Sequence, residues 1–355
     1  PFRYEQNVES EDGNNVYLTI DETIQSICEK YMQKGVEDNN VLNKGVCIAM
    51  DVNTGAILAM VTTDGYDLNN PYELSAKDKK KIKSTPKKKQ AEAESAALSN
   101  MWRNKAVADT YMPGSVFKMC VASAALEENL VNEKTSFTCT GSIEVEGETI
   151  HCSNISGHGT QNFVEAISNS CNPAFIQIGQ MLGAGKFRQY YQGFGFSDKT
   201  GIDLPGEADD EFWAEGKMGG VDLAVASFGQ NFAITPIQMI TACAAVSNGG
   251  YVVQPHVVSK ITDSKGNVIK SVDKKVKRQV ISDDTSKKMK EYLEYNTERQ
   301  GAAAGYISGY KVAGKSGTTE KRGVTKFESS FSEDYISSFC GYAPADDPQI
   351  AMLVF

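Results

Sequence analysis

A serine and a lysine three residues apart are the first side chains of this sequence with the spacing for covalent chemistry. Ser115 and Lys118 lie in the segment MPGSVFKMC, where Pro113 and Gly114 indicate a turn before a helix. Residues three apart share a helix face, so the lysine amine can reach the serine hydroxyl. The spacing permits nucleophilic catalysis, with the serine as nucleophile and the lysine as base. One copy of Ser-x-x-Lys equally suits a capping serine and a surface lysine, and the chain contains three more copies.

The helix after Ser115 predicts a buried environment for Lys118, because apolar residues occupy nearly every side of the segment SVFKMCVASAAL. A lysine has an ordinary pKa of about 10.4, and a base that works near pH 7 needs a pKa roughly three units lower. Burial and a second cation together supply a shift of that size. Lys199 and Lys315 are the candidates for this cation. We favour Lys315, because it continues the apolar run Val-Ala-Gly, whereas Lys199 lies in a polar turn segment.

A second polar segment suits the same site. Ser170-Cys171-Asn172 is the one Ser-x-Asn sequence in the chain, and Pro173 follows it. Asn172 and Pro173 also form a good N-cap and first-turn pair for the next helix. Both interpretations hold together, since a serine and an amide at a helix mouth can relay a proton and hold a substrate carbonyl.

The strand that begins near Lys315 offers groups for binding a substrate. Ser316 and Thr318 carry hydroxyls along it. Gly317 lacks a side chain, so a substrate backbone can approach the strand closely, as in recognition by strand addition.

The elements that must position these residues predict an α/β fold. Residues 46–61 read as a β-hairpin around the turn DVNTG, and the segments YKVAGKSGT, SSFCGYAPADDP and QIAMLVF predict three further strands. Asp21 is a plausible N-cap for an amphipathic helix. We expect one antiparallel sheet lobe, about 16–75 and 250–355, with a helical lobe, about 100–245, inserted into it.

The composition excludes some classes of function. A net charge of -9 argues against a general nucleic-acid binder, and the longest apolar run, IAMLVF, is far too short to cross a bilayer. Residues 77–89 carry eight lysines. Such a run predicts a solvated loop or helix face, and a docking patch for an anionic polymer is the alternative.

Ser-x-x-Lys, Ser-x-Asn and Lys-Ser-Gly in this order resemble the motif set of penicillin-binding proteins and serine β-lactamases. The resemblance runs nearly end to end and is strongest to the transpeptidase domain of class B penicillin-binding proteins, similar to the division and sporulation transpeptidases. Further stretches that carry it are LTIDETIQ, AMDVNTGAILAM, TGIDLPGE, SFGQNFAITPIQM and SFCGYAPADDP. The implied fold is that of the penicillin-binding proteins and serine β-lactamases.

The resemblance implies acyl transfer on peptidoglycan stem peptides, a reaction that needs no cofactor, and acylation by β-lactam antibiotics. Ser115 would attack the bond between two terminal D-alanines, Lys118 would take its proton, and Lys315 would supply positive charge. Ser170 and Asn172 would relay a proton and hold substrate. The remaining roles also follow from the resemblance: the N–H groups of Ser115 and Thr318 as the oxyanion hole, and the hydroxyls of Ser316 and Thr318 on the substrate carboxylate.

The resemblance also sets expectations for the whole protein. Residues 1–15 would be a remnant of an amino-terminal pedestal, and residues 16–355 the transpeptidase domain without its carboxy-terminal helix. The family implies an amino-terminal membrane helix outside this chain, a location on the extracytoplasmic face of the membrane, and a membrane glycosyltransferase as partner. A serine β-lactamase and a β-lactam sensor domain are the rival functions, and the rate of deacylation separates the first of them.

A group of soft ligands suggests a metal. Cys139 and Cys152 are separated by twelve residues that alternate around Gly147 as a small hairpin would, and His158 follows six positions later. Two thiols and an imidazole suit a structural zinc ion, which needs four ligands. We expect Asp109 as the fourth, with His151 as the substitute. A Cys139–Cys152 disulfide and two unlinked thiols are the alternatives.

Overall fold

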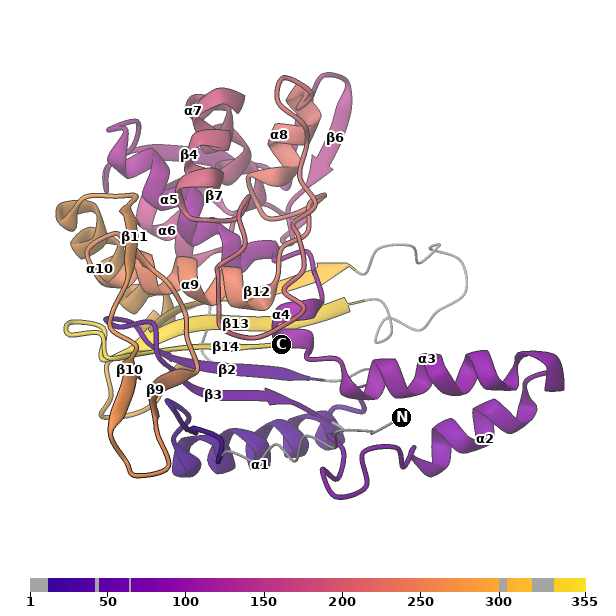
Figure 1. Cartoon of the computed structure of the whole chain (residues 1–355). Helices are drawn as coiled ribbons and strands as arrows, with labels where there is room; N and C mark the ends of the chain where they lie inside the picture. Colours follow the sequence, from indigo (N-terminus) through magenta and orange to yellow (C-terminus); the bar gives the residue numbers. More distant parts are fainter. Residues whose placement is uncertain (1–11, 42–44, 64, 300–304, 321–334) are drawn as a thin grey trace, which may run out of the picture.

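A five-stranded antiparallel sheet, assembled from both ends of the chain, forms the centre of the fold (Figure 1). The computed structural model describes residues 12–41, 45–63, 65–299, 305–320 and 335–355, so residues 1–11 of the expected pedestal remnant lie outside it. The strand order is β12-β13-β14-β2-β3, which confirms the prediction of one sheet built from both termini. The bounds are β2 (Val46–Asp51), β3 (Ile57–Thr62), β12 (Ala313–Glu320), β13 (Tyr335–Ala343) and β14 (Ile350–Val354).

The turn between β2 and β3 explains why this part of the sheet was predictable. The Asp51 carboxylate accepts the backbone N–H groups of Asn53 at 2.8 Å and Thr54 at 3.0 Å, a local bond pattern that favours a turn. Gly55 has a φ of +85°, and a Cβ there would lie 2.5 Å from the carbonyl oxygen of Gln254. The sequence DVNTG therefore specifies the predicted hairpin locally.

One face of the sheet is covered by α1 (Glu22–Asp38). Asp21 caps this helix as predicted, because its side chain accepts the N–H of Ile24 at 2.9 Å. Cys28 and Met32 are the buried residues of α1, and they pack against small residues of β2 and β3. This small apolar cluster attaches the helix to the sheet.

Helices cover the other face of the sheet. The central one is α9 (Pro236–Ser247), in which every residue is buried and which contacts β2, β13 and β14. Its start is fixed by a capping box between Thr235 and Gln238. The other helices on this side are α4 (Lys105–Ala108), α5 (Lys118–Glu127), α6 (Phe163–Ser168), α7 (Asn172–Gly193), α8 (Gly220–Ala226) and α10 (Asp283–Arg299).

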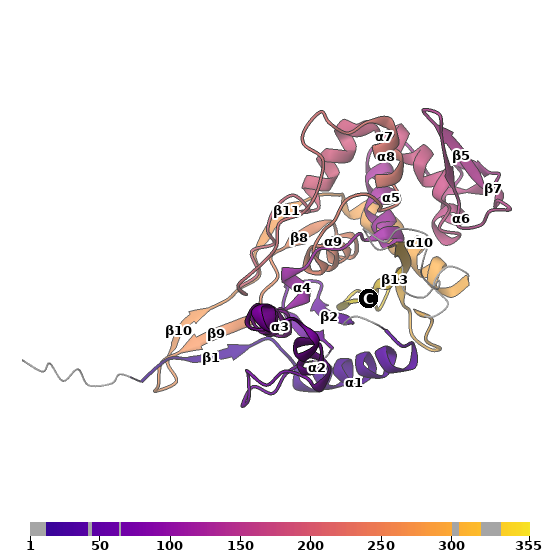
Figure 2. The ribbon, with the colours of Figure 1, turned by 90° about the vertical axis from the view of Figure 1, so that its right-hand side faces the viewer.

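Among the described residues, four small sheets surround this body. The sheet β1-β9-β10 extends away from it on one side (Figure 2). The hairpin of β5 and β6 turns at Gly147, as predicted between Cys139 and Cys152. The strands are β1 (Asn15–Leu18), β4 (Ser136–Cys139), β5 (Ser142–Val145), β6 (Glu148–His151), β7 (Gly159–Asn162), β8 (Tyr251–Val253), β9 (Val258–Thr262), β10 (Val268–Ser271) and β11 (Val276–Gln279).

A helical arm projects from the body between β3 and α4 (Figure 1). It consists of α2 (Ala76–Ser84), the short 3-10 turn η1 (Lys87–Lys89) and α3 (Gln90–Trp102). Pro86 cannot continue a helix after α2, so the chain turns back there. None of the helices in the described part of the chain combines the length and apolar content that a membrane crossing requires.

Candidate active site

The candidate nucleophile lies in a tight turn that packs against β12. Ser115 is half-buried in the 3-10 turn η2 (Gly114–Phe117), directly before α5. Gly114 has a φ of +59°, and a Cβ there would lie 2.0 Å from Oγ1 of Thr319. Only glycine fits this position without a shift of the neighbouring strand. The close approach holds the serine beside the strand that carries Lys315.

Lys118 is the first residue of α5, and its side chain is fully buried. Its amine lies 2.7 Å from the carbonyl oxygen of Ser170, 3.2 Å from the Ser170 hydroxyl and 2.8 Å from Oδ1 of Asn172. Its nitrogen also lies 5.2 Å from the centre of the Phe175 ring. The structure therefore brings three of the predicted site residues into one hydrogen-bonded group.

Lys315 supplies the second cation that the sequence required. It is 1% exposed on β12, and burial lowers its pKa to about 8. Burial lowers the pKa of Lys118 well below its ordinary value, and the positive charge of Lys315 lowers it further. The alternative, Lys199, is exposed and pairs with Asp209 at 3.5 Å. The effect of its charge on Lys118 supports the choice of Lys315 over Lys199, which stays a prediction.

The loop between α6 and α7 presents Ser170 and Asn172. A capping box at Asn162 and Glu165 starts α6, and Ser170 then adopts a φ of +50°, which turns the chain sharply. Asn172 begins α7, with Pro173 in the first turn. The amide Nδ2 of Asn172 donates to the carbonyl oxygen of His151 at 3.3 Å. The segment starts a helix as expected, and its two polar side chains also contact Lys118. Their roles in proton relay and substrate binding stay predictions.

Strand β12 places the predicted binding residues next to the nucleophile. Ser316 is half-buried and Thr318 is exposed, so both lie where a ligand can reach them. A Cβ at Gly317 would lie 2.8 Å from the Ser338 hydroxyl and 3.2 Å from the backbone N of Val116. The glycine therefore allows the nucleophile's own turn to approach β12, a role that we did not predict for it.

The arrangement suits acyl transfer at a serine. A buried amine with a lowered pKa is neutral in a larger fraction of molecules near pH 7 and can accept a proton. When neutral, it has two N–H groups, which match its two shortest bonds, to the Ser170 carbonyl and Asn172 Oδ1. Its lone pair is then free for a hydroxyl proton, such as that of Ser170 at 3.2 Å.

A cluster of three thiols and an imidazole adjoins this site, because one of its members, Cys171, lies between Ser170 and Asn172. Ligand atoms of Cys139, Cys152, His158 and Cys171 all lie within 4.8 Å of one another. Three of the four are the residues predicted from spacing. Cys171, the central residue of Ser-x-Asn, was not predicted as a ligand, because the spacing of Cys139, Cys152 and His158 does not indicate it. All eight cysteines are free in the structure, so the alternative Cys139–Cys152 disulfide is not formed.

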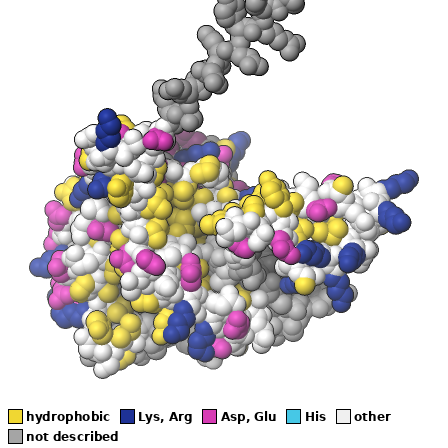
Figure 3. Space-filling view, turned by 60° about the horizontal axis from the view of Figure 1, so that its bottom comes forward, with side chains coloured by type: hydrophobic (Ala, Val, Ile, Leu, Met, Phe, Trp, Pro, Cys, Tyr) yellow, Lys and Arg dark blue, Asp and Glu magenta, His cyan; other side chains and the backbone are white. Residues whose placement is uncertain are grey.

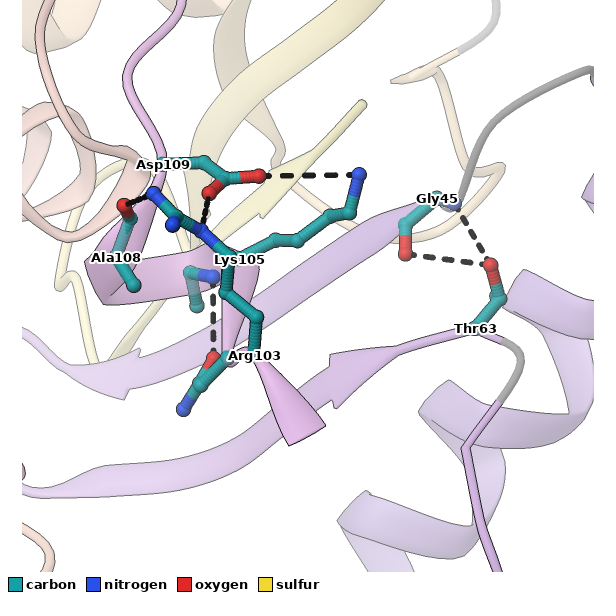
Figure 4. Close-up of polar contacts among 8 residues, drawn as sticks. Gly45, Thr63, Arg103, Lys105, Ala108 and Asp109 are labelled. Carbon is teal, nitrogen blue, oxygen red and sulfur yellow. Dashed lines mark hydrogen bonds and ion pairs between the residues drawn. The ribbon is translucent and has the colours of Figure 1, made fainter. Parts of the chain in front are cut away.

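The expected fourth ligand, Asp109, lies elsewhere. It follows α4 and forms ion pairs with Arg103 and with Lys105, the latter at 3.7 Å (Figure 4). The prediction was wrong because two nearby cations on its own segment hold this carboxylate. The substitute, His151, contributes its backbone carbonyl to Asn172, and its ring is not part of the cluster.

Comparison with known proteins places this chain in a family. A model of the penicillin binding protein transpeptidase domain matches residues 45–355. Stage V sporulation protein D of Bacillus subtilis (strain 168) is 34% identical over 345 residues, which cover 97% of this chain and 49% of that protein. Peptidoglycan D,D-transpeptidase PbpA of Mycobacterium tuberculosis (strain H37Rv) is 29% identical, with 96% of this chain and 67% of that protein covered.

The structural comparison agrees with the sequence comparison. The crystal structure of the D,D-transpeptidase domain of a peptidoglycan glycosyltransferase from Eggerthella lenta matches with a TM-score of 0.79 at 26% identity. That match covers 99% of this chain and 80% of the other, which confirms the expected fold. The chain spans about half the length of the first curated relatives it matches. It belongs to the family of penicillin-binding protein transpeptidase domains.

Proposed function

We propose that this chain is the catalytic domain of a serine-type peptidoglycan D,D-transpeptidase. The observation that carries the proposal is the buried Lys118 amine, bonded to both Ser170 and Asn172 and lowered in pKa by burial and by Lys315. The relatives named as peptidoglycan D,D-transpeptidases support it. We further propose that residues 16–355 form the transpeptidase domain, with a helical lobe inserted into the sheet lobe.

In the first step of the proposed reaction, the Ser115 hydroxyl attacks the carbonyl carbon between two terminal D-alanines of a stem peptide. Lys118 accepts the hydroxyl proton, and the N–H groups of Ser115 and Thr318 stabilise the oxyanion. The C–N bond breaks, the leaving D-alanine amine takes up the proton, and an ester to Ser115 remains. The amine of a second stem peptide then attacks this ester and forms the cross-link as the C–O bond to Ser115 breaks. The amine gives up one proton, which returns to the Ser115 oxygen through Lys118.

Covalent labelling with a fluorescent penicillin tests this assignment. A β-lactam acylates the same serine, so wild-type protein should be labelled and Ser115→Ala should not. Ser84→Ala is the matched control, since it removes the serine of another Ser-x-x-Lys segment on the exposed helix α2. Labelling that persists in Ser115→Ala would contradict the assignment. Rapid release of the label would identify a β-lactamase, because a transpeptidase hydrolyses the penicillin ester on its serine only slowly.

The chemistry of the substrate suggests where and with what the enzyme works. Peptidoglycan lies outside the cytoplasm, so we propose an extracytoplasmic location, with the membrane anchor that the family resemblance implies. Cross-linking uses glycan strands that a glycosyltransferase polymerises, and we propose a membrane glycosyltransferase as partner. The likeness to a protein named for stage V of sporulation supports a role in sporulation or cell division.

We also propose a structural zinc ion at Cys139, Cys152, His158 and Cys171. Three thiolates and one imidazole form a common zinc ligand set, and a tetrahedral site with Zn–S bonds of about 2.3 Å places its ligand atoms roughly 4 Å apart. The spacing within 4.8 Å supports this fit. The ion would connect β4, the loop after β6 and the N-cap of α7. It would take no part in acyl transfer.

Elemental analysis of protein purified without added metal tests the zinc proposal. We expect about one zinc ion per chain, lost in Cys152→Ser. Cys47→Ser is the control, since Cys47 is a buried thiol on β2 outside the cluster. Metal-free protein with Cys139 and Cys152 oxidised would contradict the proposal.

A further inference from the structure

The helical arm concentrates positive charge on an acidic protein. Eight lysines lie between residues 77 and 89 with Asp78 as the one acidic residue among them, whereas the whole chain carries a net charge of -9. Each of these lysines is exposed. Figure 3 shows dark-blue side chains along the projecting arm at the right, away from the body. The arm is therefore a separate basic surface.

Most lysines of residues 77–89 lack an ion-pair partner in the described part of the chain, although α3 adds Glu92 and Glu94 to the arm. Within the described part of the chain, Lys79 is the one lysine of the eight with an ion-pair partner, Glu73 at 3.0 Å. Lysines elsewhere on the surface do find local partners, as Lys288 does with Asp284 and Lys311 with Asp346. Like charges on one short helix repel each other, so a bound polyanion would relieve this repulsion by replacing the diffuse salt ions around the arm.

The lysine side chains point to several sides of α2, and this distribution limits the kind of anion that can bind. Successive helix residues are rotated by about 100°, so Lys79, Lys80 and Lys81 point to different sides of α2. Ile82, the one large apolar residue of α2, is half-buried, and the helix lacks the apolar face that a membrane-surface helix needs. Flat protein interfaces are depleted in lysine. A flexible chain of repeated negative charges can contact cations on several sides at once.

The base of the arm adds exposed aromatic surface. The Trp102 indole N–H donates to the carbonyl oxygen of Pro71 at 2.7 Å, and the Tyr72 ring packs edge-on against it with ring centres 5.4 Å apart. Tyr72 is 74% exposed, and neighbouring Leu68 is 79% exposed. Rigid, exposed aromatic rings offer the flat apolar surface on which sugar rings stack. A ligand that suits both the lysines and the aromatic rings carries repeated acidic groups and sugar rings, as an anionic glycan polymer does.

We propose that the arm binds peptidoglycan through the free carboxylates of its stem peptides, at a site separate from the catalytic centre. This inference rests on the proposed function, which makes peptidoglycan the substrate. The segment from α3 leads through α4 directly into η2, so the arm and Ser115 belong to one continuous part of the chain. A strand held on the arm raises the effective concentration of its other stem peptides at the nucleophile.

Co-sedimentation with purified peptidoglycan, freed of phosphate-containing polymers, tests the proposal. The arm variant combines Lys80→Gln, Lys81→Gln, Lys87→Gln and Lys88→Gln. The control variant removes the same number of exposed lysines from the region of β9 to β11, through Lys265→Gln, Lys270→Gln, Lys274→Gln and Lys275→Gln. We expect the arm variant to bind about tenfold or more weakly, with a shallower dependence on salt. The control should bind almost as the wild type does.

The reaction with fluorescent penicillin distinguishes a failure of the docking proposal from a failure of the proposed function. Both variants should be acylated at the wild-type rate, because a small β-lactam does not need the arm. Unacylated wild-type protein would overturn the proposed function, whatever the sedimentation shows. Equal binding by the arm and control variants would overturn the docking site. So would binding only to walls that retain phosphate polymers, or stronger binding to vesicles of anionic phospholipid.

Discussion

The side-chain amine of Lys118 lies 2.8 Å from Oδ1 of Asn172, the residue at which α7 begins. Nδ2 of the same amide donates to the carbonyl oxygen of His151, at the end of β6. Asn172 therefore connects the proposed base to the β5–β6 hairpin, and its two bonds define which way the amide points. The neutral amide can orient the lysine without stabilising its charged form as strongly as a carboxylate would.

Asn172→Asp tests this relationship. An aspartate places a negative charge beside Lys118 and raises the pKa of its amine, so less neutral base is present at pH 7. Each unit of increase removes about tenfold of the neutral form, and we expect acylation by penicillin at pH 7 to slow by at least that much. Asn169→Asp is the control, because Asn169 bonds to Gln161 instead. An unchanged rate with an unchanged pH profile would contradict the arrangement.

Lys118→Arg separates positive charge from proton transfer. Arginine stays protonated in proteins, so it cannot act as the neutral base. General-base catalysis contributes about 10²- to 10⁴-fold, and we expect the second-order acylation rate constant to fall by that factor while the protein stays folded by circular dichroism. Lys199→Arg, at an exposed lysine, should react normally. Rapid acylation of Lys118→Arg would remove this lysine from the mechanism.

The two lysines predict a bell-shaped pH dependence of acylation. The reaction needs neutral Lys118, so the rate constant rises with pH through the lowered pKa of that amine. It also needs charged Lys315, so the rate falls as that group loses its proton near pH 8. In Lys315→Met the alkaline fall should disappear. The rising limb should also move to higher pH, because one of the two causes that lower the pKa of Lys118 is gone.

This profile is measured as the acylation rate constant from pH 5 to 10, over the range in which the protein stays folded. Lys277→Met is a suitable control, since burial also lowers the pKa of Lys277 but the residue lies on β11, away from the site. A rising limb at the same pH in wild type and Lys315→Met would show that the two charges do not interact.

Gly114→Ala tests the packing of the nucleophile's turn against β12. Alanine at a φ of +59° costs about 1–2 kcal/mol, and its Cβ would also meet Thr319 Oγ1 at 2.0 Å. Gly147→Ala is the matched control, because its φ is +88° but nothing lies within 4 Å of the added carbon. We expect a larger loss of melting temperature and a slower acylation in Gly114→Ala. Equal effects of the two substitutions would show that close packing is unimportant.

Much of the fold followed from local signals in the sequence. The turn at Asp51 to Gly55, the cap at Asp21 and the hairpin around Gly147 each depend on residues a few positions apart, and each was predicted. The choice of Lys315 as the cation that acts on Lys118 had a different basis. A base with a lowered pKa requires a second cation, and the apolar run before Lys315 placed that lysine in the core.

The features that were missed depend on long-range packing. Cys171 joins the thiol cluster because the loop after β6 folds onto the start of α7, and no local spacing indicates that contact. The backbone at Val116 packs closely against Gly317, because η2 contacts β12 although the two are far apart in the sequence. Asp109 was misassigned for the opposite reason, since local ion pairs with Arg103 and Lys105 outweighed the proposed distant role.

The position of Cys171 between Ser170 and Asn172 leads to the last prediction. If the thiol cluster holds zinc, the metal fixes the backbone from which both polar side chains reach Lys118. Removing the metal with a chelator should therefore lower the melting temperature and the acylation rate together, and Cys171→Ser should do the same without a chelator. Cys243→Ser is the control, because this thiol is buried in α9 and outside the cluster. Zinc added back to chelated wild type should restore both properties, and Cys171→Ser should not recover. A chelated enzyme that melts at a lower temperature yet reacts at the full rate would show that the cluster stabilises the fold without positioning Ser170 and Asn172.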